Sequence, residues 1–435
     1  AAVAPETPSV SQAYHTHPAY LSPVVETTPA ACEQCCDSGC RQAQFAQCCP
    51  PSDLPRLGPH AGACEAGWFH GRLWYSAEYL AWATKGVDFP VLVTTGDSSI
   101  SGENAGALGL PDIEILFGGA HLHDDMVSGG RFTLGYWATP CQRTGVEAAL
   151  FGIGGRDIRH RFTSEDFPVI ARPYTDATNT DPKTNQESLL IAYPDMSDVQ
   201  FSGSTRVDAD MDLIGGEVQL RQALLWREKG RIDVLAGYRH AFLFDQLAIH
   251  DESVALDMNT DFAEDTVITR DDLFRTKNYF HGGQLGFATR LWRGCWSCSL
   301  TTKAAYGGVR TRSTVFGQTD EIPPNTPPGD MPVYKHNGVL GQPSNNGLRI
   351  FEDQAFLGEI GLQLEYQLTC RSRIALGYTF LYWDSVVRQA PLIDTMINPD
   401  QIPPGAIAPG ARPKFTLVRD DFWAQGLKAV FEHQF

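Results

Sequence analysis

The stretch Glu359–Trp383, EIGLQLEYQLTCRSRIALGYTFLYW, alternates apolar and polar side chains on both sides of a short break. A period of two is the period of a β-strand whose two faces differ in environment. The break at residues 369–372 is short enough for a tight turn between antiparallel neighbours. The stretch therefore predicts a β-hairpin with one continuous apolar face, which carries Ile360, Leu362, Leu364, Tyr366, Leu368, Ile374, Leu376, Tyr378, Phe380 and Tyr382.

The same alternation recurs along the chain from about residue 70 to the C-terminus. The connections between these segments alternate in length, which is the pattern of an up-and-down meander. Short connections are predicted at 138–144, 225–230, 292–294 and 369–372, and long ones at 84–128, 156–205, 245–270, 310–350 and 388–420. The ten segments are 71–83, 130–137, 145–152, 214–224, 231–239, 279–291, 295–306, 359–368, 373–383 and 423–435.

Short turns at one end and long loops at the other are typical of outer-membrane barrels. We therefore expect an all-β fold, a closed up-and-down antiparallel transmembrane β-barrel of about ten strands, with twelve as the alternative count. Closure leaves no exposed strand edge. The soluble alternative is a β-rich surface protein.

Composition narrows the function classes. The chain has 435 residues, 43% hydrophobic residues and a mean hydropathy of −0.22. Its longest nearly apolar run, Ile374–Trp383, is too short for a membrane-spanning helix, which needs about 20 residues. The net charge is −17, with 34 basic against 51 acidic residues, and this opposes binding to nucleic acid.

Aromatic residues near strand ends favour the membrane interpretation, because Trp and Tyr gather at membrane interfaces. The last strand ends with Phe431 and Phe435, which resembles the C-terminal signal that barrel-assembly machinery recognises. Some of the aromatic residues could instead be ordinary core residues. Those predicted for the interfacial girdles are Trp74, Tyr75, Trp82, Trp137, Trp226, Trp292, Trp296, Trp383 and Trp423.

The polar faces of the strands predict a lumen lined by charges of both signs. Because a ten-stranded barrel is only slightly wider than one that side chains fill, mixed charges at this density predict a narrow or occluded pore. The alternative is a selective eyelet of arginines facing carboxylates. The predicted lumen residues are Arg72, Glu78, Arg131, Glu147, Glu217, Arg221, Arg231, Asp233, Arg239, Arg290, Lys303, Glu359, Glu365, Arg373, Lys428 and Glu432.

The chain divides into a Pro-rich flexible tether (1–31), a cysteine-rich, disulfide-stapled segment (32–67) and the barrel (68–435). The missing initiator Met and the dense cysteines indicate export to an oxidising compartment, where a signal peptide has been removed or the chain trimmed. A metal cluster is the alternative, since Cys32 and Cys35 have ligand-like spacing. Because the number of cysteines is odd, one of them would be free or joined to another chain. The disulfide candidates are Cys32, Cys35, Cys36, Cys40, Cys48, Cys49, Cys64, Cys141, Cys295, Cys298 and Cys370.

Other candidate sites are weak. The link 251–272 is rich in Asp and Glu and is interpreted as a solvated acidic loop, with a divalent-cation site as the alternative. His121, His123, Asp124 and Asp125 form a second cluster with metal-binding side chains. We find no Ser/His pair on adjacent strands, no phosphate-binding Gly loop and no zinc-protease motif. The sequence therefore predicts no enzyme activity and no cofactor.

Several strings resemble the planctomycete β-barrel porin-7 family over residues 70–435. The resemblance implies an outer-membrane barrel in a planctomycete-type envelope, and it does not extend to the cysteine-rich segment. The strings are LWYSAEYLAW (73–82), VLVTT (91–95), GAL (106–108), LFGG (116–119), SGGRFTLGYW (128–137), LAGYR (235–239), FHGGQL (280–285), LGYTFLYW (376–383) and DFWAQG (421–426).

Two functional hypotheses follow. The first is a porin-like protein of the bacterial outer membrane that passes small hydrophilic solutes by diffusion. The second is a structural envelope protein whose occluded barrel anchors it and whose cysteine-rich segment, on the periplasmic side, cross-links it to neighbours. The expected partners are outer-membrane lipid, the barrel-assembly machinery and either further copies of the chain or a disulfide-linked envelope protein.

Overall fold

The structure is a computed structural model of the whole chain. It describes residues 72–435 except 101–103, 140–141, 155–156, 183, 195–199, 257–261, 325–332, 336 and 404–411. The predicted tether (1–31) and cysteine-rich segment (32–67) lie outside the described residues. So do Cys32, Cys35, Cys36, Cys40, Cys48, Cys49, Cys64 and Cys141.

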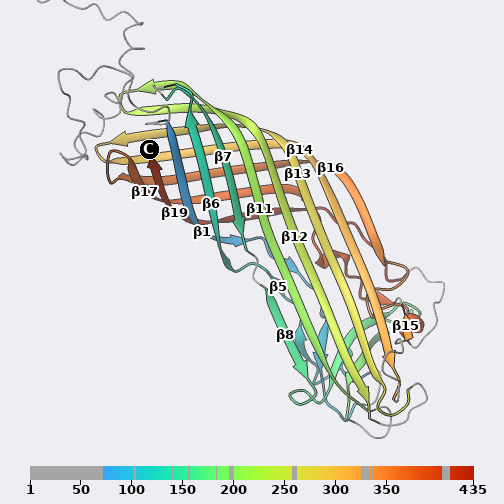
Figure 1. Cartoon of the computed structure of the whole chain (residues 1–435). Helices are drawn as coiled ribbons and strands as arrows, with labels where there is room; N and C mark the ends of the chain where they lie inside the picture. Colours follow the sequence, from blue (N-terminus) through green and yellow to red (C-terminus); the bar gives the residue numbers. More distant parts are fainter. Residues whose placement is uncertain are drawn as a thin grey trace, which may run out of the picture.

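Ten long antiparallel strands form the main sheet, and their hydrogen bonding runs in a ring (Figure 1). Going round it, the order is β1, β6, β7, β11, β12, β13, β14, β16, β17 and β19, and β19 pairs again with β1. The prediction of about ten antiparallel strands is confirmed. The strands are β1 (Leu73–Thr84), β6 (Met126–Trp137), β7 (Thr144–Ile153), β11 (Phe201–Arg227), β12 (Gly230–Ala255), β13 (Val267–Arg293), β14 (Trp296–Ile322), β16 (Gly347–Gln367), β17 (Ser372–Val386) and β19 (Asp420–Gln434).

All four predicted short connections are present, and they lie at the same end of the ring as the C-terminus (Figure 1). We call this the short-turn end. Two of the turns have only two residues: Arg227 pairs with Gly230 between β11 and β12, and Arg293 pairs with Trp296 between β13 and β14, where Gly294 and Cys295 form the turn. Gly294 has a φ of +59°, a left-handed conformation that glycine adopts without a steric penalty.

The opposite end carries the long links, and here the structure differs from the prediction. Strands β11 to β14 have 26 or 27 residues, far more than the roughly 9–11 that cross a membrane. The predicted links 245–270 and 310–350 are therefore largely strand. The alternation of buried and exposed side chains continues along these extensions. Their outward residues are polar instead of apolar, so the sequence pattern alone does not identify the extensions as strands.

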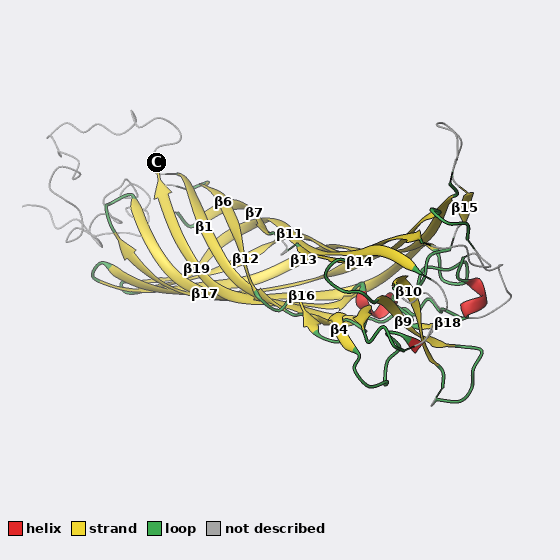
Figure 2. Cartoon of the chain, turned by 90° about the horizontal axis from the view of Figure 1, so that it is seen from below, coloured by secondary structure: helices red, strands yellow, loops and turns green. Residues whose placement is uncertain are grey.

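The remaining strands pack against these extensions and build a second body, which we call the head (Figures 1 and 2). A sheet of β10, β9, β3 and β4, with β18 beside β9, makes one layer. The short strands are β2 (Val87–Asp88), β3 (Val93–Thr95), β4 (Glu114–Phe117), β5 (His121–Leu122), β8 (Ile158–Thr163), β9 (Ile170–Asp176), β10 (Gln186–Ala192), β15 (Val333–Lys335) and β18 (Met396–Ile397), with 3-10 turns η2 (Ala390–Leu392) and η3 (Pro399–Gln401). The described residues contain no helix long and apolar enough to cross a membrane.

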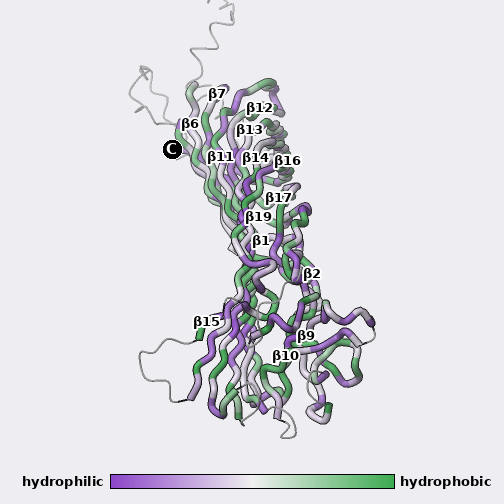
Figure 3. The backbone as a smooth tube through the Cα atoms, turned by 90° about the vertical axis from the view of Figure 1, so that its right-hand side faces the viewer, coloured by the Kyte–Doolittle hydropathy of each residue, from purple (hydrophilic) through white to green (hydrophobic). Residues whose placement is uncertain are grey.

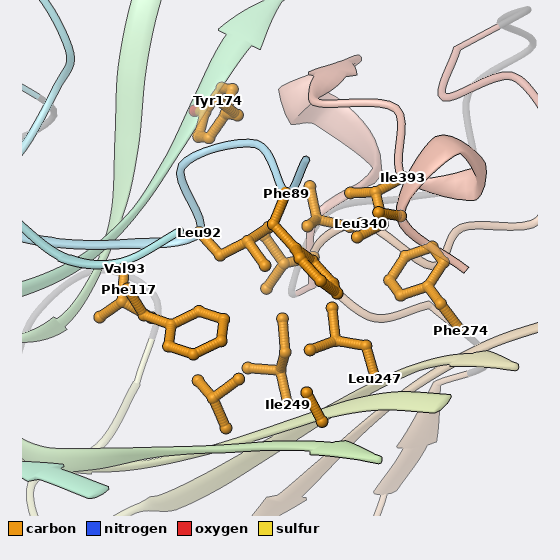
Figure 4. Packing of buried hydrophobic residues seen from close by; sticks show 14 of the residues in the cluster. Phe89, Leu92, Val93, Phe117, Tyr174, Leu247, Ile249, Phe274, Leu340 and Ile393 are labelled. Carbon is orange, nitrogen blue, oxygen red and sulfur yellow. The ribbon is translucent and has the colours of Figure 1, made fainter. Parts of the chain in front are cut away.

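The head has a hydrophobic core of its own (Figure 4). Leu247, Ile249 and Phe274 come from the extended strands, whereas Phe89 and Leu340 come from two different long links. All five are at most 3% exposed. The long links are therefore folded parts of a globular body. Figure 3 shows three strands of this body, β9, β10 and β15, at the end of the molecule away from β6 and β7.

Candidate functional site

Most of the predicted lumen residues line one cavity inside the ring near the short-turn end. The cavity has a volume of about 140 Å³. Small-molecule sites usually measure about 300–1,000 Å³, so this cavity is smaller than most of them. Of the sixteen predicted residues, those that line it are Glu78, Arg131, Glu147, Glu217, Arg221, Arg231, Asp233, Arg290, Lys303, Glu359, Arg373, Lys428 and Glu432.

The other three lumen candidates do not line the cavity. Arg239 and Glu365 also point into the ring, where they are 1% exposed because ion pairs with Glu359 and Arg290 cover them. Arg72 is half-buried and precedes β1, and its backbone carbonyl accepts a hydrogen bond from Trp137 N.

Ion pairs cross the inside of the ring at the level of Glu359. Arg131 on β6 and Arg239 on β12 donate to its two carboxylate oxygens at 2.6 and 2.5 Å. Arg131 and Glu359 come from strands four places apart in the ring, and Lys303 on β14 donates to Glu217 on β11, three places away. Such pairs bridge the lumen instead of lying along its wall. They fill the space that a solute would need.

Two further clusters lie closer to the short turns. Arg221 donates to Glu147 at 2.5 Å and to Asp233 at 2.9 Å. Arg290 and Arg373 lie 3.3 and 3.6 Å from Glu365. Pairing on this scale leaves a lumen with little free charge.

An apolar layer closes the ring next to the charged cavity, on the side of the head. Each of the ten ring strands contributes at least one side chain to it. Trp82 on β1 and Trp383 on β17 are both 0% exposed, and Arg131 of the charged layer lies 5.1 Å from the Phe151 ring centroid. The members are Leu80, Trp82, Val127, Phe151, Ile153, Met211, Leu213, Ala241, Leu243, Phe280, Ala305, Val309, Ala355, Leu357, Leu381, Trp383, Val386, Phe422 and Ala424.

This layer corrects the predicted aromatic girdle. Trp82 and Trp383 do not face a membrane interface, because they have the inward parity of Glu78 and Leu381 on the same strands. Trp74 and Trp137 line the cavity. Trp226 pairs with the cavity-lining Arg231, whose guanidinium lies 4.6 Å from its ring centroid, so it also has the inward parity. Trp296 is 52% exposed on the outer face, as a girdle requires. A position near a strand end does not by itself show whether an aromatic side chain faces the lumen or the membrane.

A segment of the last long link, residues 386–402, covers the apolar layer from the head side. We call it the mouth segment. Its Arg388 donates two hydrogen bonds to Asp245 on β12, at 2.6 and 3.1 Å, and both side chains are nearly fully buried. Asn278 on β13 donates to the carbonyl of Val387 and accepts from its N–H. The mouth segment is thereby tied to the wall of the ring.

The acidic link 251–272 is not a solvated loop throughout, which corrects the prediction. Asp251 and Asp272 are buried and accept hydrogen bonds from the buried Arg172 of β9, at 2.7 and 3.2 Å. Asp272 also accepts from the backbone N–H groups of Leu340 and Gly341. Burial raises the pKa of Asp272, and Arg172 opposes this. Asp257 and Asp261 lie outside the described residues. Within the described part, no group of three metal-binding side chains is present.

The second predicted cluster also separates. His121 bonds to Asp88 at 2.7 Å, whereas His123 is buried, has a φ of +65° and packs 6.5 Å from the Phe89 ring centroid. Neither ring nitrogen of His123 has a hydrogen-bond partner among the described atoms. Burial, reinforced by Arg388, lowers the pKa of His123 to about 4.

Acid should therefore destabilise the head through His123. Above about pH 6.5, the pKa of histidine in the unfolded chain, His123 is neutral in both states and does not oppose folding. As the pH falls from about 6.5 towards 4, the unfolded chain takes up a proton that the buried ring cannot, so the free energy of unfolding decreases. We expect a loss of about 2 kcal/mol between pH 7.5 and pH 5, measured by urea unfolding in detergent. His123→Asn, which tolerates the left-handed backbone, should abolish that part of the pH dependence. An unchanged pH profile in the variant would contradict the assignment.

The described cysteines differ in state. Cys295 and Cys370, both at short turns, are disulfide-bonded. Cys298, predicted as a disulfide candidate, is instead a free and exposed thiol. The reason is strand parity, because its neighbours Ser297 and Ser299 point inward and bond to Glu365, which leaves Cys298 on the outer face of β14.

The C-terminal aromatics lie on the outer face of β19. Phe431 and Phe435 are 39% and 47% exposed, and their ring centroids lie 6.2 and 5.8 Å from that of Tyr75 on β1. The last and first strands of the ring thus share an aromatic contact.

Sequence reasoning missed three groups that shape the site: the apolar layer, Arg388 and Arg172. The only signal for the layer was that Leu80 and Trp82 continue the parity of Ser76 and Glu78. Arg388 and Arg172 lie in long links and gave no signal, because their partners are distant in sequence.

The chain also resembles known proteins. The profile of the family described as Putative beta barrel porin-7 (BBP7) matches residues 74–435. The chain belongs to this family. The expectation from the sequence strings is confirmed, and the chain is an outer-membrane-type β-barrel protein of a porin-like family. No curated protein matches it.

Among solved structures, the BBP7 chain is similar to the outer membrane protease OmpT from Escherichia coli, with 8% identity, a TM-score of 0.37, and coverage of 84% of this chain and 97% of that one. It is also similar to a Pseudomonas aeruginosa FadL homologue, with 6% identity, a TM-score of 0.26 and coverage of 83% and 90%. A mutant of the monoaromatic hydrocarbon channel TodX has 10% identity, a TM-score of 0.20 and coverage of 84% and 91%.

Proposed function

We propose that this BBP7 protein is a sealed outer-membrane barrel that anchors its folded head at the cell surface. The observation that carries the proposal is the apolar layer, to which all ten ring strands contribute. A layer of close-packed side chains leaves no aqueous path for an ion. The role is structural and involves no catalysis or cofactor.

The outer face of the ring supports a membrane position. Exposed apolar residues form a band around it, which runs from Trp296 to Tyr306 on β14 and from Phe356 to Tyr366 on β16 and so matches the length of a transmembrane strand. Leu285, Leu300 and Leu362 represent this band on β13, β14 and β16, and they are 66%, 43% and 52% exposed. Apolar surface of this extent is unfavourable in water and favourable in lipid.

The orientation follows from turn length. Short turns face the periplasm in outer-membrane barrels and long links face outward. We place the short-turn end, and with it residues 1–67, in the periplasm, and the head outside the cell. The cysteine-rich segment would then meet the turns that carry Cys295 and Cys370. Disulfide linkage to an envelope partner, assembly into homo-oligomers and delivery by the barrel-assembly machinery belong to this proposal.

Diffusion of small hydrophilic solutes is the second candidate, and the porin description of the family favours it. It would require the mouth segment to leave its site and the apolar layer to part. The buried Arg388–Asp245 pair and the packing of Trp82 and Trp383 oppose both movements.

Ion conductance of the purified, unreduced protein in a planar bilayer tests the two candidates. We expect no steady conductance above the bare membrane, with a general porin in the same bilayer as the positive control. The slower electrophoretic migration of the protein after boiling establishes that the barrel is folded, and co-flotation with the lipid vesicles fused to the bilayer establishes insertion. Discrete, salt-dependent steps from inserted protein would contradict the sealed barrel and support diffusion.

A further inference from the structure

The outer face of the ring carries one patch that neither the sealed lumen nor the head explains. It lies where the apolar band ends on β13 and β14. Lys277 pairs in register with Arg312, and Tyr279 with Arg310. Arg275 is two residues beyond Lys277 and has the same outward parity. Four cations therefore stand together just beyond the membrane band.

The cations are combined with aromatic rings. Lys277 Nζ lies 5.7 Å from the ring centroid of Phe244, and the Arg312 guanidinium lies 5.8 Å from that of Tyr279. The rings of Phe242 and Tyr279 are 4.8 Å apart. Aromatic residues beside basic ones are the composition of a membrane interface, where rings sit at headgroup level.

The charges of this patch are incompletely compensated. Arg310 is 3.8 Å from Glu352, and Arg275 donates to Gln246 at 2.7 Å. For Lys277 and Arg312, no carboxylate oxygen of the described residues lies within 4.0 Å. Elsewhere at this level the outward charges are mainly acidic, on β11, β16, β17 and β19, with Asp212, Glu352, Asp384 and Asp421. The basic surplus is therefore local to β13 and β14.

A groove adjoins the cations. It has a volume of about 400 Å³, and its floor is at Gly308, which has no side chain to fill the space between β13 and β16. Its walls are Tyr279, His281, Val309, Arg310, Glu352, Asp353 and Gln354, so two acidic residues line it on the β16 side, away from Lys277 and Arg312. One end of the groove faces the apolar band and the other faces the cations.

We propose that this patch binds the phosphate-bearing headgroup of an outer-leaflet glycolipid. Phosphate would lie between Lys277, Arg310 and Arg312, where charge-assisted hydrogen bonds are available, and an acyl chain would lie along the apolar band below Tyr279. A lipid fits this patch better than a soluble acidic protein does, because the cations adjoin the lipid-facing surface. The inference rests on the proposed membrane position but not on whether the lumen is sealed.

Native mass spectrometry of the full chain in a neutral detergent tests the proposal, with bis-phosphorylated lipid A as the probe. Each basic residue near an anionic surface contributes about a factor of five in affinity, so Lys277→Gln with Arg312→Gln should weaken binding roughly thirtyfold. The charge-conserving pair Lys277→Arg with Arg312→Lys should bind within about threefold of the original chain.

The matched control is Arg159→Gln with Arg206→Gln. It removes two exposed cations, but from β8 and β11, where both lie next to Asp208. We expect it to leave lipid A binding unchanged. Equal affinity of the Lys277/Arg312 variant and the original chain would overturn the proposal. So would full displacement of lipid A by equimolar inorganic phosphate, since the site would then recognise free phosphate. The sealed barrel is tested by conductance and the glycolipid site by mass spectrometry, so the failure of one proposal leaves the other standing.

Discussion

Replacing Arg172 with methionine should lower the free energy of unfolding of the head by about 3 kcal/mol, because two buried carboxylates lose the guanidinium that donates to both of them, and the buried Arg270 is the cation that remains near them. Asp251 and Asp272 are both fully buried, so water cannot replace the lost hydrogen bonds. Thr205 and two backbone N–H groups would remain as donors to them. We expect urea unfolding in detergent to show the loss.

The pH dependence of this variant identifies the cause. Protonation would neutralise the abandoned carboxylates, so the loss in Arg172→Met should be smaller at pH 5 than at pH 8. Adding Asp251→Asn and Asp272→Asn should recover most of the stability. Arg206→Met, which removes an exposed arginine, is the control and should cost less than about 1 kcal/mol. A pH-independent loss would indicate lost packing instead.

Arg388→Met should release the mouth segment. Asp245 would be left buried without a partner, at a cost of about 3–5 kcal/mol, and the segment would lose its strongest tie to β12. We expect limited proteolysis to cut residues 386–402 at least tenfold faster than in the original chain, as the free energy of local opening falls by more than 1.4 kcal/mol.

Two comparison variants separate charge from packing at this site. Asp245→Leu with Arg388→Met replaces both partners by apolar side chains and should restore protection. Arg419→Met removes an ion pair with Asp353 that lies outside the mouth segment and in which Arg419 is 40% exposed, and it should leave cleavage unchanged. Equal cleavage of Arg388→Met and the original chain would show that the apolar residues hold the mouth segment by themselves.

These predictions concern the part of the protein that makes its BBP7 barrel unlike an open pore. The charged layer bridges the lumen, the apolar layer fills it, and the mouth segment and head core cover it. In the sealed barrel that we propose, any conducting state would have to disrupt all three. The proposed orientation leaves the head as the surface available for interactions outside the cell.

Much of the ring followed from the sequence, whereas the head did not. The hairpin at 359–383 was predictable because alternation and turn length are local properties. The strand extensions of β11 to β14 were missed, because their outer faces are polar and only their inner faces pack, against segments far along the chain. The core contact between Phe89 and the extended strands is an example, since Leu247 and Phe274 lie more than 150 residues away.

For the ring, the sequence by itself determined the number of strands, their up-and-down order and the inward position of the charges. These properties depend on a period of two along each strand and on short connections between strands. Only the tertiary structure decided which charges pair and whether the lumen is open. Arg131 meets Glu359 across 228 residues because the ring brings β6 and β16 to opposite sides of one narrow space. Leu80 and Trp82 share the parity of Glu78, and they become a seal because nine other strands place apolar side chains at the same height.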